Sequence, residues 1–350
     1  MTRFAFFLPF ILTLTACSDR PKNAQGQLLE VVINPIVERG ADPWIIKQDS
    51  LFHYCYSEGG AIHVKSVGKF SELNETEAHM IWQAPDSGAY SREMWAPELH
   101  KIDSKWYVYF AADDGENKNH RMHVLSSSSD IPHTGFSYTG KVSDDTDKWA
   151  IDGTVFTLNG KIYFVWSGWE AEVNEAQHLY IAEMSSPTQI SSERVKISSP
   201  EFEWEKRGSS EELPTINEGP QVLQKGGRTF IVYSASGSWS NDYCLGLLEL
   251  KGGDPMLPEL WEKSEKPVFS GTEQVISPGH ASFIISGGQD YIVYHAMPVK
   301  GGGWASRQVR IQPFSWKEGM PYFGLPVGNE VEVKIEYFTN QLTPGKHAQR

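Results

Sequence analysis

The stretch from Gly153 to Trp166 reads GTVFTLNGKIYFVW, two runs rich in aromatic and β-branched residues around the pair Asn159-Gly160. An Asn-Gly pair between two such runs is typical of a two-residue β-hairpin, because both residues tolerate the positive φ that this turn requires. The sequence therefore predicts two antiparallel strands joined by this turn.

The same hairpin unit recurs along the chain, and this repeat predicts the architecture. Each copy combines a short strand, a turn rich in Gly, Asn or Asp and a strand rich in aromatic and β-branched residues. The leading residues of the five copies are Asp42, Pro97, Asp152, Glu218 and His280. Their spacings of 55, 55, 66 and 62 residues suit one four-stranded blade per copy around a central channel. We therefore predict an all-β fold, a five-bladed β-propeller over residues 31–340.

Two other architectures agree less well with the sequence. No long window shows helical periodicity, which argues against a (β/α) barrel. A β-sandwich is the alternative all-β fold, but it would not explain the regular recurrence of the hairpin unit. The 12 Trp and 14 Tyr residues supply enough aromatic surface for a large core and for rings that face a ligand.

Polar residues open most of the units, and in a propeller the starts of the innermost strands converge at one mouth of the channel. These residues are Asp42, Glu98, Asp152, Glu218 and His280. Three of the acids, Asp42, Asp152 and Glu218, adjoin Pro or Gly, which allows a sharp entry into the strand. A single such acid is most often an ordinary turn residue. Three acids at equivalent places of a repeat favour a functional site instead.

Clustered carboxylates suit glycoside hydrolysis, in which a protonated carboxyl group donates to the leaving oxygen and an ionised one activates water. A third negative charge nearby would raise the pKa of the acid by repulsion. The sequence contains no Gly-x-Ser-x-Gly nucleophile motif, no His-Glu-x-x-His zinc motif and no phosphate-binding glycine loop. The carboxylates are therefore the best supported catalytic groups.

Five motifs open the units in the order Ala41-Asp42-Pro43-Trp44-Ile45, Trp95-Ala96-Pro97-Glu98-Leu99-His100, Ile151-Asp152-Gly153-Thr154-Val155, Asn217-Glu218-Gly219-Pro220 and Pro278-Gly279-His280. Together they resemble glycoside hydrolase family 43 over nearly the whole chain. The resemblance implies a five-bladed propeller and an inverting mechanism on arabinose- or xylose-containing glycans. It implies Asp42 as general base, Asp152 as the carboxylate that tunes and orients the acid, and Glu218 as general acid.

The resemblance also implies residues that bind the substrate and a cation. The stretches around Trp95, Trp169 and Trp239 look most like α-L-arabinofuranosidases, so these rings are expected to stack on sugar, with core packing as the alternative. Arg307 stands where family members often place a sugar-contacting Arg. His280 matches a channel histidine that in many members contacts Ca²⁺, often through water. No organic cofactor is expected.

We accordingly predict an exo-acting, inverting glycoside hydrolase that releases terminal α-L-arabinofuranosyl residues from plant-type polysaccharides or oligosaccharides. An endo-arabinanase or a β-xylosidase is an alternative on the same fold, because these enzymes share the catalytic frame. A non-catalytic glycan-binding lipoprotein is an alternative of another class, against which the three carboxylates argue. A structural propeller that docks a partner protein is a further alternative, although the sequence shows no exposed apolar stripe.

The N-terminus has the features of an export signal. A mostly apolar run of 11 residues ends at Leu14 and is too short to span a bilayer. The tetrapeptide Leu14-Thr15-Ala16-Cys17 resembles a bacterial lipobox. We therefore expect a lipoprotein signal peptide at 1–17, a flexible tether at 18–30, and a protein exported to the bacterial cell envelope and anchored there by lipid.

The charge and the cysteine content limit the kinds of partner that we expect for this protein. The 31 basic and 44 acidic residues give a net charge of −13 without a Lys/Arg-rich patch, which argues against nucleic acid. Cys55 and Cys244 stand among aromatic residues and are expected to be buried free thiols rather than a disulfide or a nucleophile. We expect a monomer whose partner is an arabinose-containing glycan and which meets the membrane only through its lipid anchor.

Overall fold

The computed structural model describes residues 28–337, which form strands and short 3₁₀ turns and confirm the predicted all-β class. Three sheets have four strands, one has nine and one has two. The first sheet contains β2 (Trp44–Gln48), β3 (Leu51–Glu58), β4 (Ala61–Val67) and β5 (His79–Gln83). The second contains β6 (Arg92–Ile102), β7 (Lys105–Asp113), β8 (Arg121–Ser127) and β9 (Phe136–Val142).

The remaining elements complete the chain. The nine-stranded sheet contains β10 (Ala150–Leu158), β11 (Lys161–Gly168), β12 (Ala176–Ser186), β13 (Gln189–Ile190), β14 (Val195–Ser198), β15 (Thr215–Lys225), β16 (Arg228–Ala235), β17 (Cys244–Leu250) and β18 (Trp261–Lys263). The last four-stranded sheet contains β19 (Ile276–Ser286), β20 (Gln289–Met297), β21 (Gln308–Lys317) and β22 (Met320–Tyr322). β1 (Leu28–Ile33) pairs with β23 (Glu332–Tyr337). The 3₁₀ turns are η1 (Phe70–Glu72), η2 (Asn117–Asn119), η3 (Glu203–Glu205), η4 (Pro258–Leu260) and η5 (Trp304–Ser306).

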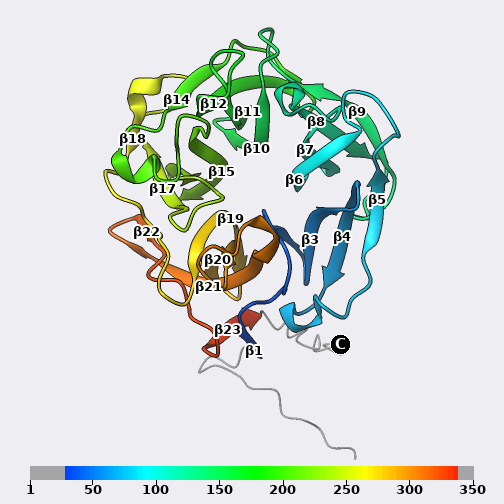
Figure 1. Ribbon diagram of the computed structural model, residues 1–350. Coiled ribbons are helices and arrows are strands. Elements are labelled where there is room, and N and C mark those ends of the chain that lie inside the picture. Colours follow the sequence, from blue (N-terminus) through cyan, green and yellow to red (C-terminus); the bar gives the residue numbers. More distant parts are fainter. Residues whose placement is uncertain (1–27, 338–350) are drawn as a thin grey trace, which may run out of the picture.

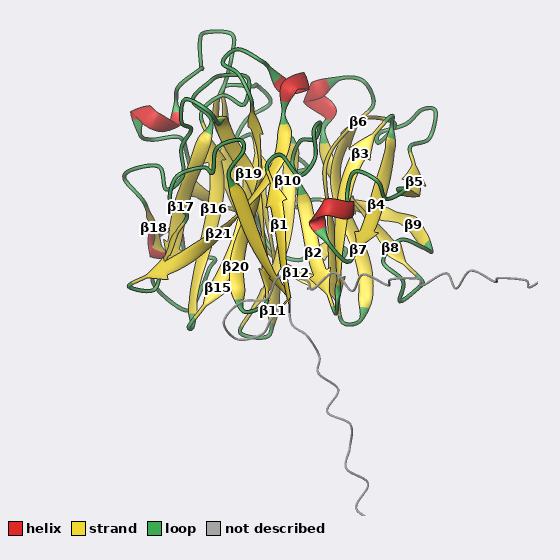
Figure 2. Cartoon of the chain, turned by 90° about the horizontal axis from the view of Figure 1, so that it is seen from below, coloured by secondary structure: helices red, strands yellow, loops and turns green. Residues whose placement is uncertain are grey.

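The sheets stand around a common axis, as in a β-propeller (Figure 1). The first strand of each hairpin unit lies innermost, and these strands contact one another in the closed order β2, β6, β10, β15, β19 and β2 again. Figure 2 shows the strands running between the two faces of this ring. The alternative β-sandwich would instead have stacked two sheets face to face.

All five hairpin units are present, with their turns at the predicted places. The antiparallel pairs are β2–β3, β6–β7, β10–β11, β15–β16 and β19–β20. In the turn of the third unit, φ is 52° at Asn159 and 78° at Gly160, and in the fourth it is 59° at Gly226 and 79° at Gly227. Positive φ at both turn residues matches the right-handed twist of the paired strands, which explains the choice of Asn and Gly.

The core fills the space between neighbouring sheets. Buried side chains form clusters that join adjacent sheets, and one of them packs Tyr109 of β7 against Phe164 of β11 with ring centroids 5.5 Å apart. Cys55 and Cys244 are buried free thiols, as predicted. Burial raises the pKa of both thiols, and to about 12 for Cys244, so neither forms a ready thiolate.

The two ends of the described chain pair with each other through β1 and β23. The last three residues of the predicted tether at 18–30 belong to β1, so this boundary is corrected. The physical reason is a distant contact, because the Glu30 carboxylate accepts the backbone N–H groups of Phe70 and Ser71 at 3.0 and 2.8 Å. The predicted signal peptide at 1–17 lies outside the described residues. Within residues 28–337, none of the helical turns has the length or the apolar character to cross a membrane.

Candidate active site

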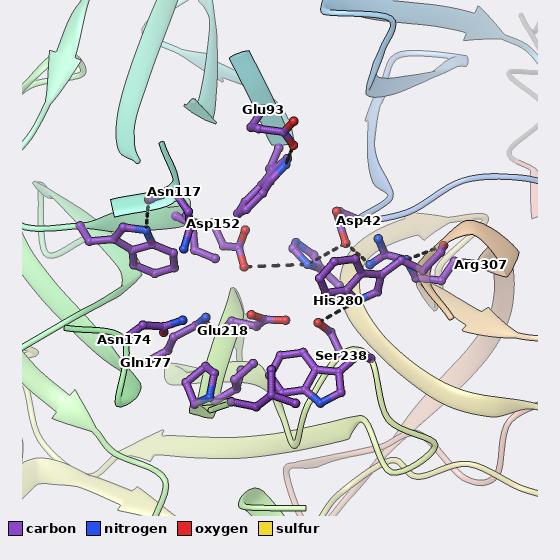
Figure 3. A pocket seen from close by; sticks show the side chains of 18 residues that line it. Asp42, Glu93, Asn117, Asp152, Asn174, Gln177, Glu218, Ser238, His280 and Arg307 are labelled. Atoms are coloured by element: carbon purple, nitrogen blue, oxygen red, sulfur yellow. Dashed lines mark hydrogen bonds and ion pairs between the residues drawn. The ribbon is translucent and has the colours of Figure 1, made fainter. Parts of the chain in front are cut away.

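A cavity of about 620 Å³ opens where the innermost strands begin (Figure 3). Asp42, just before β2, lines it together with Asp152 of β10, Glu218 of β15 and His280 of β19. These four residues are far apart in the sequence. The closed ring of innermost strands brings them together, as the equivalent positions in the repeat predict.

A left-handed backbone residue occurs at each of these strand starts. The φ angle is 46° at Asp42, 54° at Asp152 and 47° at His280, and Gly219, directly after Glu218, has a φ of 54°. The register with the neighbouring strand shifts at the same places in β10, β15 and β19. Such irregularities re-aim a side chain, and each non-Gly residue held there costs of order 1–3 kcal/mol. Backbone strain therefore coincides with the residues that face the cavity.

Asp42 is held as a carboxylate. Its Oδ1 lies 3.1 Å from Nδ1 of His280 and 3.4 Å from Nη1 of Arg307. Its backbone N–H donates over 3.1 Å to Nδ1 of His295, a ring whose pKa burial lowers to about 4. Burial alone would raise the pKa of Asp42, but the charges of His280 and Arg307 outweigh it and hold that pKa well below its usual value. Because His280 and Arg307 both reach Oδ1, Oδ2 is the oxygen that they leave for a water.

Glu218 and Asp152 have pKa values shifted in the opposite direction. Burial, followed by the charge of Asp152, raises the pKa of Glu218 to about 8, although the Tyr243 hydroxyl donates to Glu218 over 2.8 Å and opposes this shift. Burial also raises the pKa of Asp152 to about 6, and the charge of His280 opposes it. The backbone N–H of Gly219 donates to Asp152 over 3.0 Å. Glu218 therefore holds its proton to a higher pH than a free glutamic acid does, whereas Asp42 loses its proton at a lower pH than a free aspartic acid.

His280 is an ion-pair partner of the carboxylates. Burial would lower its pKa, but Asp42 and Asp152 raise it to about 10, and its Nδ1 lies 3.1 and 4.0 Å from these two side chains. A protonated imidazole has no lone pair for a cation. Residues 28–337 also contain no group of three or more His, Cys, Asp or Glu side chains placed to hold a metal ion. The described side chains therefore offer no cluster of direct ligands for Ca²⁺, and the contact of His280 with a hydrated cation stays a prediction. A Ca²⁺ ion held through water and backbone carbonyls stays a prediction.

Three of the four residues predicted to bind the substrate line the cavity. They are Trp95, Trp239 and Arg307. The indole N–H of Trp95 donates to Oε2 of Glu93 over 3.2 Å, and that of Trp239 donates to the carbonyl of Gly208 over 2.8 Å. These bonds fix the planes of both rings at the edge of the cavity, where a sugar face can pack against them.

The prediction that Trp169 stacks on a sugar is wrong. Its side chain is 3% exposed and belongs to a buried cluster. Its ring stacks on Trp149 with centroids 4.6 Å apart and planes 9° apart, and it is Trp149 that lines the cavity. Trp169 therefore supports the wall from behind, which is the core-packing alternative for this ring.

Eleven further residues line the cavity although the sequence predicts no site role for them. They are Glu93, Asn117, Trp149, Ile151, Asn174, Gln177, Leu213, Pro214, Ile216, Ser238 and Trp304. The proximity of Trp149 and Ile151 to Asp152 in the chain is a signal that could have identified them. Trp304 stands three residues before Arg307 in a glycine-rich loop and is 56% exposed. Side chains from such loops carry no strand periodicity, so their direction is set by the fold alone.

The cavity thus presents a carboxyl group with a lowered pKa, Asp42, and another with a raised pKa, Glu218. Asp42 can accept a proton from water, and Glu218 can give a proton to a leaving oxygen. Burial and then the negative charge of Asp152 raise the pKa of Glu218, which favours its protonated form. Two carboxyl groups whose environments separate their pKa values are the arrangement that acid–base hydrolysis of a glycosidic bond needs.

Comparison with known proteins agrees with this chemistry. The family model for glycosyl hydrolases family 43 matches residues 32–321. The chain is 35% identical to an extracellular exo-α-(1→5)-L-arabinofuranosidase of Streptomyces avermitilis, over 94% of this chain and 70% of that protein. It is 34% identical to a protein of the same name from Streptomyces chartreusis, over 76% of this chain and 83% of that protein. The crystal structure of an α-L-arabinofuranosidase from Lactobacillus brevis is similar with a TM-score of 0.79 and 33% identity, over 85% of this chain and 98% of that chain.

Proposed function

The chain belongs to the glycosyl hydrolases of family 43, and we propose that it is an exo-acting α-L-arabinofuranosidase that inverts the anomeric carbon. The observation that carries this proposal is a single cavity in which the pKa of Asp42 is lowered and that of Glu218 is raised. The three carboxylates also argue against a non-catalytic binder, because a binder has no use for a base and an acid whose pKa values are shifted in opposite directions.

In the proposed reaction, Glu218 donates its proton to the glycosidic oxygen while the bond from that oxygen to the anomeric carbon breaks. Asp42 takes a proton from a water, and the water oxygen forms the new bond to the anomeric carbon. Asp152 raises the pKa of Glu218, His280 and Arg307 hold Asp42, and the rings at Trp95 and Trp239 pack on the substrate.

The substrate is inferred from the relatives, whose names specify α-(1→5)-linked L-arabinofuranosyl units and extracellular location. We therefore propose terminal arabinofuranosyl residues of plant-type glycans as substrate, and export of this chain. A lipid anchor at Cys17 and a monomeric state complete the proposal. We also interpret the nine-stranded sheet as two blades joined through a short parallel contact of β12 with β15, which gives five blades in all.

The test is incubation of the protein with aryl α-L-arabinofuranoside, aryl β-D-xyloside and linear arabinan, with product sizes followed over time. We expect arabinose as the first product from arabinan, and cleavage of the arabinofuranoside in preference to the xyloside. Early formation of intermediate oligosaccharides would identify an endo-arabinanase, and preference for the xyloside a β-xylosidase. Retention on arabinan without any product would identify a binding protein.

Inversion is tested separately by NMR of the first arabinose released. We expect the β-anomer from an α-linked substrate, before mutarotation mixes the two forms. Appearance of the α-anomer first would mean a retaining mechanism and would remove Asp42 as the base for a direct water attack.

A further inference from the structure

We propose that Glu205, with its ion-pair partner Lys263, is a positioning residue for Glu218, an inference that rests on the proposed function of the cavity. Glu205 lies in η3, in the segment between β14 and β15, and the structure does not place it in the cavity lining. Its side chain is fully buried, and its Oε1 lies 3.1 Å from Nζ of Lys263. No sequence motif points to it.

Many donors hold this one carboxylate in a single orientation. Oε2 accepts the backbone N–H groups of Glu201 and Phe202 at 2.8 and 2.9 Å. Oε1 accepts the hydroxyl of Tyr233 at 2.9 Å in addition to its contact with Lys263. Charge-assisted bonds of this kind are stronger and more directional than neutral ones.

A further donor connects Glu205 to the proposed acid. Nδ2 of Asn217 donates to Oε1 of Glu205 over 3.0 Å, and Oδ1 of Asn217 accepts the hydroxyl of Ser198 over 2.7 Å. The carbonyl of Asn217, in the peptide bond that leads into Glu218, accepts the hydroxyl of Ser167 over 2.9 Å. The residue before Glu218 is therefore fixed at its side chain and at its backbone, and Glu205 is the charged group in this arrangement.

The same turn holds a second wall of the cavity. The carbonyl of Glu205 accepts the backbone N–H of Ser236 over 3.0 Å. Three residues after Glu205, the carbonyl of Gly208 accepts the indole N–H of Trp239 over 2.8 Å. Glu205 thus lies between the strand that carries Glu218 and the loop that carries Trp239.

Stability alone does not account for this ion pair. Removing two charges from water offsets much of their mutual attraction, so a well-packed apolar pair would serve a purely structural role at least as well. A general acid, in contrast, depends on position, because a misplacement of about 1 Å can cost on the order of 10²-fold in rate.

The test is Glu205→Gln, assayed on α-1,5-arabinobiose and on nitrophenyl α-L-arabinofuranoside well below the lowest Tm of the variants. The NH2 group of Gln would replace one carboxylate oxygen and face donors instead of accepting from them, so the turn and Asn217 should shift. We expect kcat/KM on arabinobiose to fall about 10–100-fold and that on the nitrophenyl substrate less than about 3-fold. The selectivity follows because nitrophenolate leaves without a proton from Glu218.

Glu30→Gln is the matched control. Glu30 is also a buried carboxylate that accepts two backbone N–H groups, from Phe70 and Ser71, and a tyrosine hydroxyl, from Tyr337. The Glu30→Gln variant should lower Tm and should change kcat/KM on the two substrates by the same factor. If Glu205→Gln does not fold, the double variant with Lys263→Met removes both charges and should show the same selective loss.

Equal losses on the two substrates, or no loss in either variant, would overturn the positioning role. The proposed acid itself is tested independently by Glu218→Ala. A selective loss in Glu218→Ala with none in Glu205→Gln would reject this inference and leave the proposed function standing.

Discussion

At the scale of single residues, Asp42 and Glu218 differ through their neighbours rather than through their own chemistry. Glu218 is buried and Asp42 is half-buried, and the loss of contact with water raises the pKa of each. Two cations, His280 and Arg307, reverse this effect at Asp42. The negative charge of Asp152 adds to it at Glu218. The division of labour between base and acid therefore follows from the signs of the neighbouring charges.

The Glu218→Ala variant should lose much more activity on substrates with a poor leaving group than on substrates with a good one. We expect kcat/KM on arabino-oligosaccharides to fall on the order of 10²–10⁴-fold, because a sugar hydroxyl is a poor leaving group without a proton. The loss on the nitrophenyl glycoside should be much smaller. Asp42→Ala is the control, since water must lose its proton whichever group leaves, and it should be impaired on both substrates alike. Equal losses of Glu218→Ala on the two substrates would mean that Glu218 is not the general acid.

Asp152→Asn should move the alkaline limb of the pH profile. Activity requires protonated Glu218 and is lost as pH rises through its pKa of about 8, which Asp152 helps to raise. Removing that negative charge lowers the pKa of Glu218, so the alkaline limb of kcat/KM should shift to lower pH by about 1 unit. The Asn side chain can still accept the N–H of Gly219. The exposed Glu262→Gln should leave the limb in place, and an unmoved limb in Asp152→Asn would contradict the coupling.

At the scale of elements, the innermost strands start with an irregularity, and the neighbouring side chains must fit around it. In β19, an added Cβ at Gly279 would lie 2.2 Å from a ring carbon of Tyr243. Tyr243 is itself buried and donates to Glu218. The absence of a side chain at Gly279 therefore allows β19 to pass close to the ring that contacts the acid.

Gly279→Ala should consequently displace Tyr243 and damage the site. We expect a loss of about 1–3 kcal/mol in stability from overpacking, together with a fall in kcat/KM on arabinobiose. Gly253→Ala is the matched control, because an added Cβ there meets nothing within 4 Å. The Tyr243→Phe variant keeps the ring but removes the hydrogen bond from the Tyr243 hydroxyl, which lowers the pKa of Glu218. The alkaline limb of the pH profile of this variant should therefore move to higher pH. Wild-type activity in Gly279→Ala would contradict this account.

At the scale of the whole molecule, the cavity depends on closing the ring of sheets. The last four-stranded sheet contacts the first through β19 and β2, and β1 pairs with β23 beside them. Val32, Val333 and Ile335 of this pair belong to the buried cluster that joins these sheets. The N- and C-terminal strands therefore stabilise the junction without lining the cavity.

Ile335→Ala should lower stability and spare catalysis. Ile335 is fully buried, so we expect a loss of about 2–5 kcal/mol in the free energy of unfolding, measured by denaturant titration. Ile33→Ala in β1 is the control, because Ile33 is 55% exposed and should change little. Unchanged kcat/KM at low temperature is expected for both. A loss of activity in folded Ile335→Ala would mean that the junction also shapes the cavity.

The sequence by itself determined the strands, the hairpin turns and the convergence of Asp42, Asp152, Glu218 and His280, because turn chemistry and strand periodicity are local and the repeat places equivalent residues equivalently. The tertiary structure alone decided the rest. It places the face of Trp169 against Trp149, extends β1 to Leu28, and sets the pKa values through burial and charges far apart in the chain. Such effects depend on which residues the closed ring brings into contact, and no local pattern encodes them.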